Sequence, residues 1–248
     1  MPAPMRSMNP VLKDEVFRRE QSFAVGETMS MQGTIHKSIS AVALCFLSAL
    51  LTWQYAAQSP AIQGIITLSL IGGLILYFIT LFKKSWSPVT VPLYSIAEGA
   101  VLGGVSLAFE ARFPGIVFNT VLLTFGVLFT MLTVYRLGWI KVTNKLRIGI
   151  ISAGGAIALI YIVDMIMHFF GHGVPYIHQS TNIGIGFSLV VVAIASMFLL
   201  LDFDFIERAV QARSPKYMEW FGAFGLLVTL VWLYLEILTL LAKLQSRR

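Results

Sequence analysis

Seven apolar runs dominate the chain after residue 39, and short polar segments rich in Pro, Gly, Lys or Arg separate them. A helix needs about 20 predominantly apolar residues to cross the ~30 Å hydrocarbon core of a bilayer, and each run is close to that length. The pattern therefore predicts seven transmembrane helices, at Ser40–Ala57, Ile62–Phe82, Val91–Phe109, Ile116–Tyr135, Ile148–Phe170, Ile183–Phe205 and Met218–Ala242.

Composition supports an all-α integral membrane protein, because only 12% of the 248 residues are charged, about half the fraction in soluble domains. We expect a polar tail over residues 1–39 and one transmembrane domain over residues 40–248. The net charge of +6 is explained by basic loops, so no nucleic-acid partner is expected. The single cysteine, Cys45, excludes an internal disulfide, and no catalytic motif indicates an enzyme or a cofactor.

Lys and Arg are distributed unequally between the two predicted sides of the membrane. The tail and the loops after the second, fourth and sixth runs hold 14 of the 18, whereas the other loops and the C-terminal segment hold four. Because basic residues stay on the cytoplasmic side, we expect the N-terminus inside and the C-terminus outside.

Apart from Glu219 at the start of the last run, five acidic residues fall within the predicted spans, and no Lys or Arg lies well inside any span. The five are Glu98, Asp164, Asp202, Asp204 and Glu236. Burying one such charge in a bilayer costs about 2.5–3.5 kcal/mol on insertion scales. Each acid is therefore expected to be protonated and hydrogen-bonded, to reach a basic residue at the interface, or to hold a cation such as Ca²⁺.

The last two runs carry motifs that resemble the Bax inhibitor motif family. The segment SMFLLLDFDFI from Ser196 to Ile206 is similar to its sixth helix, and LYLEIL from Leu233 to Leu238 is similar to its seventh. Lys83 stands where that family often has a basic cluster. The segments NPVL after Met8 and KYMEW from Lys216 resemble a bacterial branch of the family.

The resemblance implies that the last helix is central, with the other six around it. It also implies a pH-sensitive Ca²⁺ leak channel or exchanger, in which Asp202 and Glu236 share a proton as a latch between the sixth and seventh helices. Glu236 is one methylene longer than the family's aspartate. Lys83 or Asp204 is a candidate partner for Asp202 and Glu236, and Ca²⁺ is a candidate ligand near these two acids. Glu98 and Asp164 are candidates for lining the pathway.

A second function stays open, that of a non-conducting regulator that binds another membrane protein, such as a quality-control protease. The N-terminal tail would then be the contact element. Under either function we expect a multi-pass protein of the bacterial inner membrane.

The charge distribution makes a prediction about topology. A reporter that works only in the cytoplasm should be active when it is fused after Met1 or within residues 136–147, and inactive after Arg248. Activity at all three positions in a fusion assay would contradict a chain with seven spans.

Overall fold

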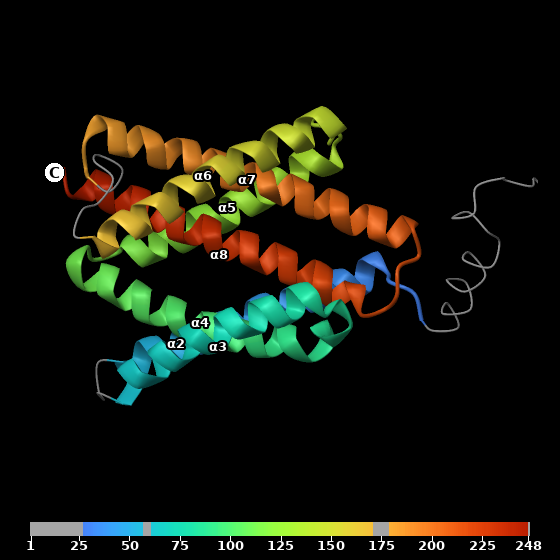
Figure 1. Cartoon of the computed structure of the whole chain (residues 1–248), viewed down its shortest axis with the longest axis horizontal. Coiled ribbons are helices and arrows are strands. Elements are labelled where there is room, and N and C mark those ends of the chain that lie inside the picture. Colours follow the sequence, from blue (N-terminus) through green and yellow to red (C-terminus); the bar gives the residue numbers. More distant parts are fainter. Residues whose placement is uncertain (1–26, 57–60, 171–178, 248) are drawn as a thin grey trace, which may run out of the picture.

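The computed structural model describes residues 27–56, 61–170 and 179–247, and these residues form seven long helices (Figure 1). The prediction of seven membrane-spanning helices is confirmed, because all seven are long and apolar enough to cross a bilayer. Their bounds are α2 (Met31–Ala56), α3 (Ala61–Phe82), α4 (Ser87–Arg112), α5 (Ile116–Arg136), α6 (Asn144–Phe169), α7 (Asn182–Gln211) and α8 (Met218–Gln245).

The largest difference from the predicted boundaries is at the start of α2. Residues 31–39, which we expected in the polar tail, form the first turns of this helix. They were assigned to the tail because they are polar, but Thr34 and Ser38 donate their hydroxyl groups to carbonyl oxygens one turn earlier. Such bonds satisfy the hydroxyl groups within the helix itself. The structure does not describe residues 1–26.

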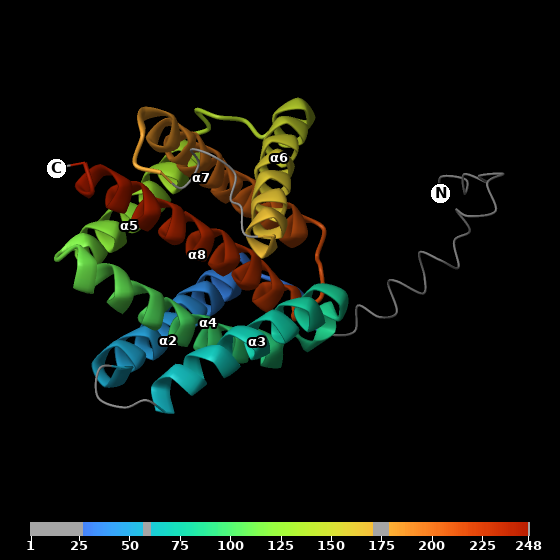
Figure 2. The ribbon, with the colours of Figure 1, turned by 60° about the vertical axis from the view of Figure 1, so that its left-hand side comes forward.

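Helix α8 runs through the middle of the bundle, as expected (Figure 2). It packs against α2, α4, α5 and α7 along its length. It also meets α3, where the rings of Phe224 and Tyr77 lie 5.5 Å apart, and α6, through a hydrogen bond between Tyr161 and Glu236. Because protein surrounds it, α8 is the most buried of the seven helices.

Local sequence signals explain where several helices begin. Thr143 and Thr181 accept hydrogen bonds from backbone N–H groups at the starts of α6 and α7, which is the usual role of an N-terminal cap. Gly115 has a φ of 82° in the turn before α5, a conformation that favours glycine.

Helices α2 and α4 approach each other closely at two glycines of α4. A Cβ atom on Gly99 would lie 2.1 Å from the carbonyl oxygen of Cys45, and one on Gly103 would lie 2.4 Å from that of Ala49. Small residues at such positions allow helices in membranes to pack with their backbones in near contact.

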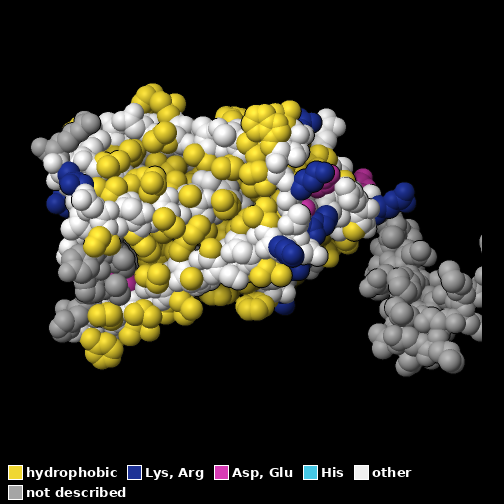
Figure 3. All heavy atoms as spheres, turned by 90° about the horizontal axis from the view of Figure 1, so that it is seen from above, with side chains coloured by type: hydrophobic (Ala, Val, Ile, Leu, Met, Phe, Trp, Pro, Cys, Tyr) yellow, Lys and Arg dark blue, Asp and Glu magenta, His cyan; other side chains and the backbone are white. Residues whose placement is uncertain are grey.

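The two ends of the bundle differ in charge, while apolar side chains cover much of the surface between them (Figure 3). We call one end the basic end; there α2, α4, α6 and α8 begin and α3, α5 and α7 end. It carries most of the described Lys and Arg, namely Lys37, Lys83, Lys84, Arg136, Lys141, Lys145, Arg147, Arg208, Arg213 and Lys216. We call the other the C-terminal end.

The close approach of α2 and α4 predicts that Gly99 cannot be enlarged. Gly99→Ala should lower the midpoint of thermal unfolding in detergent micelles, because overpacking of this kind costs about 1–3 kcal/mol. Gly126→Ala on α5 is the matched control, since a Cβ atom there would meet nothing within 4 Å. Equal midpoints for the two variants would show that the α2–α4 contact adjusts without cost.

Candidate functional site

Asp202 lies half-buried on α7 against α8, and among the described residues one of its carboxyl oxygens has no partner. Its Oδ2 is inaccessible and, among the described residues, makes no hydrogen bond. The hydroxyl group of Thr229 on α8 hydrogen-bonds to the carboxyl group, and Gly225 leaves room for it one turn earlier. An unsatisfied buried polar atom is costly, so this oxygen is suited to carry a proton or to meet a cation.

Glu236 lies further along α8 and has different partners. Its Oε1 accepts hydrogen bonds from the hydroxyl group of Tyr161 on α6, at 2.7 Å, and from the indole N–H of Trp232, at 3.2 Å. The side chain is almost fully buried. Glu236 therefore joins α8 to α6, whereas Asp202 joins α7 to α8.

The described contacts of Asp202 and Glu236 lie at different levels along α8. Thr229, the partner of Asp202, precedes Glu236 by seven residues, or about 10 Å along a helix axis. Between these two levels, the rings of Phe198 and Trp232 meet edge to face, with centroids 5.5 Å apart. An aromatic contact thus separates the two acids along the axis of the bundle.

A cavity adjoins this aromatic contact on the side of α6. Its volume is about 240 Å³, and Tyr161 and Trp232, which both donate to Glu236, contribute to its wall. Its other lining residues are Gly154, Ile157, Ala158 and Phe198. Helix α6 is largely exposed, so among the helices that line the cavity it is the one least packed against the rest of the bundle.

Asp164 and Lys243 extend the polar group around Glu236 toward the C-terminal end. Asp164 is buried on α6 one turn after Tyr161, and one of its carboxyl oxygens lies 3.5 Å from Nδ1 of His168. The ammonium group of Lys243 donates to the hydroxyl group of Ser188, at 2.7 Å, and to the carbonyl oxygen of Gly184. Lys243 also interacts electrostatically with Glu236.

Asp204 reaches basic residues near the interface, one of the three arrangements expected for an acid within a span. Arg147 of α6 donates to its Oδ2 at 2.7 Å, and Arg208 pairs with the same oxygen from one turn later on α7. Helices α6 and α7 extend beyond their predicted ends at the basic end. This brings Arg147 against Asp204.

The structure places Lys83 and Glu98 elsewhere in the bundle. Lys83 is exposed at the basic end, with its ammonium group 4.6 Å from the ring centroid of Trp86. Glu98 on α4 hydrogen-bonds to Tyr94 and faces Gly73 of α3. Both lie on the α3–α4 side, whereas the contacts of Asp202 and Glu236 lie among α6, α7 and α8.

Sequence reasoning missed the most highly connected acid, Glu219. It is fully buried at the first turn of α8, and its Oε1 accepts hydrogen bonds from the backbone N–H and the hydroxyl group of Ser30, both at 2.9 Å. Lys37 of α2 pairs with the other carboxyl oxygen, and Lys216 lies 3.7 Å from Oε1. Beside Trp220, Glu219 resembled an interfacial residue, and its partners on α2 are more than 180 residues away in sequence.

The segment before α2 is attached to the loop between α7 and α8. Met29 donates its backbone N–H to Ser214, and Lys216 donates its own to Glu27, which creates a short antiparallel bridge between Thr28 and Pro215. The exposed ammonium group of Lys216 also pairs with Glu27. Hydrogen bonding to that carboxylate raises the pKa of Lys216 above its ordinary value.

These features define a polytopic α-helical membrane protein whose central helix holds carboxyl groups at several depths. Comparison with protein families gives a match over residues 9–246 to the model described as Bax inhibitor 1 like. The chain therefore belongs to the Bax inhibitor 1 like family. No curated protein and no solved structure matched the chain. Within the described ranges, no group of three or more His, Cys, Asp or Glu side chains could hold a metal ion.

The position of Glu219 predicts a stabilising role at the basic end. Glu219→Gln should lower the midpoint of thermal unfolding in micelles, because hydrogen bonds to a charged group each contribute about 1.5–3 kcal/mol. Glu27→Gln is the matched control, since that exposed side chain pairs only at the surface. A destabilisation by Glu27→Gln as large as that by Glu219→Gln would contradict this role.

Proposed function

We propose that this protein is a pH-sensitive cation pathway, a Ca²⁺ leak channel or exchanger, in which protonation of Asp202 and Glu236 controls flux. The observation that carries the proposal is the buried Oδ2 of Asp202, which has no hydrogen-bond partner among the described residues. Family membership and the resemblance of the motifs around both acids support the same function.

Asp202 and Glu236 are suited to be two successive cation-binding positions along one pathway. Glu236 lies toward the C-terminal end, and Asp202 lies about two helical turns nearer the basic end. Carboxylates are ligands that Ca²⁺ prefers. An apolar constriction between two such binding positions can stop flux by excluding water. The edge-to-face contact of Phe198 and Trp232 occupies the position of such a constriction.

Protonation offers a physical basis for gating. When Asp202 is neutral, it can rest against Thr229 in the apolar interior without a counter-ion. When it loses its proton, its unsatisfied charge favours either a bound cation or an arrangement that admits water. Low pH would therefore favour the closed bundle and high pH the conducting one.

The location follows from the asymmetry of charge. We assign the basic end to the cytoplasm of a bacterial inner membrane, because positive residues remain on that side. The Oδ2 atom of Asp202 then lies in the half of the membrane nearer the cytoplasm, so the carboxyl group can respond to cytoplasmic pH.

One observation favours a second candidate, the non-conducting regulator. The chain enters α2 through a backbone bridge to the α7–α8 loop, so a partner that binds the N-terminal tail would reach the helices that carry both acids. Flux by purified protein in liposomes separates the two functions, because a conducting protein needs no partner. Deletion of residues 2–25 should abolish partner regulation only if the second function holds.

The proposed pathway predicts the behaviour of single variants. Asp202→Asn and Glu236→Gln each remove a titrating group and keep a group that can hydrogen-bond. Each should flatten the pH dependence of Ca²⁺ flux into proteoliposomes, measured between about pH 5 and 8. The double variant should have a larger effect than either single variant, because the two acids have separate partners.

Two results would change this proposal. A double variant no different from a single one would indicate a shared proton, since coupled sites are not additive. Wild-type pH profiles in both single variants would remove the two acids from the gate. Glu98→Gln is the matched control on the α3–α4 side, and we expect it to leave the profile unchanged.

A further inference from the structure

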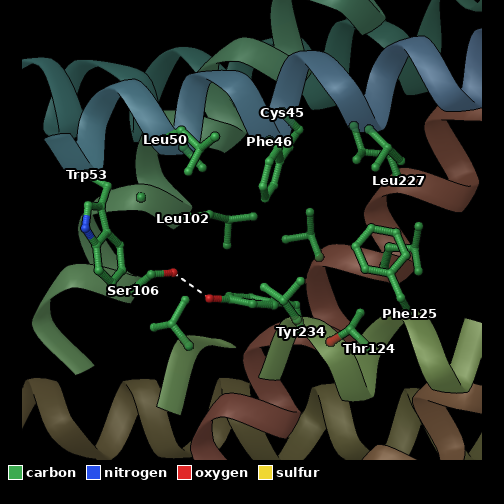
Figure 4. Close-up of a pocket in the computed structure, with 17 residues that line it drawn as sticks. Cys45, Phe46, Leu50, Trp53, Leu102, Ser106, Thr124, Phe125, Leu227 and Tyr234 are labelled. Atoms are coloured by element: carbon green, nitrogen blue, oxygen red, sulfur yellow. Dashed lines mark hydrogen bonds between the residues drawn. The ribbon is translucent and has the colours of Figure 1, made fainter. Parts of the chain in front are cut away.

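A second cavity lies on the opposite side of α8 from Asp202, among α2, α4, α5 and α8 (Figure 4). Its volume is about 150 Å³. Helix α8 contributes the buried residues Leu227, Leu230 and Val231. The remaining lining residues are Val42, Cys45, Phe46, Ala49, Leu50, Trp53, Leu102, Gly103, Ser106, Val117, Val121, Thr124, Phe125 and Tyr234.

The three hydroxyl groups in the wall of this cavity already take part in hydrogen bonds. The hydroxyl groups of Ser106 and Tyr234 hydrogen-bond to each other at 2.6 Å (Figure 4). The hydroxyl group of Thr124 donates to the carbonyl oxygen of Thr120 on its own helix. Apolar cavities of this size remain dry and take up apolar guests, so the chemistry of the wall selects a hydrocarbon.

The cavity is open on one side, toward the surface of the bundle. Most of the buried residues in its lining belong to α4 and α8, together with Cys45 of α2 and Thr124 of α5. Its exposed residues are Phe46 and Leu50 on α2 and Phe125 on α5. Both helices are membrane spans, so the medium at this opening is the hydrocarbon of the bilayer.

The extent of the cavity matches one leaflet. On α2 its lining runs from Val42 to Trp53, about 16 Å along the helix axis. Half of a ~30 Å hydrocarbon core is about 15 Å. These residues lie in the part of α2 toward Ala56, which is the C-terminal end of the bundle.

We propose that one acyl chain of a membrane phospholipid from the leaflet at the C-terminal end enters between α2 and α5 and occupies this cavity. The chain packs against Leu227, Leu230 and Val231 of α8. The opposite face of the same helix carries Thr229 and Glu236. The proposal is independent of ion conduction, because it depends only on the cavity and its opening to lipid.

The test uses the full-length protein in phosphatidylcholine vesicles whose acyl chains are brominated, since bromine quenches a tryptophan that it contacts. Comparison with Trp53→Phe isolates the emission of Trp53. Val121→Phe places a ring in the cavity, and Leu122→Phe adds a ring at the neighbouring position, where the side chain is 55% exposed. Val121→Phe should reduce the quenching of Trp53 by a factor of about two or more, because a phenyl ring fills much of the space in a packed interior, while Leu122→Phe should not.

A second measurement counts the phospholipid that remains bound in washed micelles, by native mass spectrometry. The wild type and Leu122→Phe should retain a phospholipid that Val121→Phe loses. If Val121→Phe unfolds, Val117→Phe serves as the cavity-filling variant. Equal quenching of Trp53 in the cavity-filling and control variants would show that Trp53 meets only surrounding lipid, and it would overturn the proposal. Retention of the phospholipid by the cavity-filling variant would overturn it equally.

Discussion

A carboxyl group inside hydrocarbon must be protonated, hydrogen-bonded or paired with a cation, and the contacts of the central helix α8 follow from this requirement. Glu219 meets Ser30, which immediately precedes α2, and Lys37 of α2, and these contacts fix the start of α8 against the start of α2. Glu236 draws Tyr161 of α6 against α8. The hydrogen bonds and ion pairs of these two acids hold α2 and α6 against α8. Apolar packing accounts for most of the remaining contacts of α8.

Asp202 is the exception among these groups, and the difference is informative. Thr229 hydrogen-bonds to its carboxyl group and Gly225 leaves room for it, but its Oδ2 has no hydrogen-bond partner among the described residues. The aromatic contact between Phe198 and Trp232 separates it from the polar surroundings of Glu236. Interiors that keep such a group do so at a cost in stability, and unsatisfied polar groups of this kind are typical of functional sites.

Hydrophobic patterning was sufficient to predict the fold, because each span is a continuous apolar run whose length the bilayer sets. The errors lie at helix ends such as Met31 and Gln211, where polar residues continue a helix beyond the hydrocarbon. The candidate site was less predictable. A motif placed Asp202 and Glu236 on neighbouring helices, but their relative depth depends on how α7 and α8 pack. The partners of Glu219 and Asp204 lie on helices distant in sequence, and no local pattern identifies them.

The bridge between Thr28 and Pro215 ties the segment before α2 to the loop between α7 and α8 at the basic end. Tension on the N-terminal tail would pass through two backbone hydrogen bonds into the turn that joins α7 to α8, rather than being absorbed by a free linker. That turn joins the two helices of the hairpin, of which α7 carries Asp202 and α8 carries Glu236. The same short strand contact therefore couples the segment before α2 mechanically to the hairpin of α7 and α8.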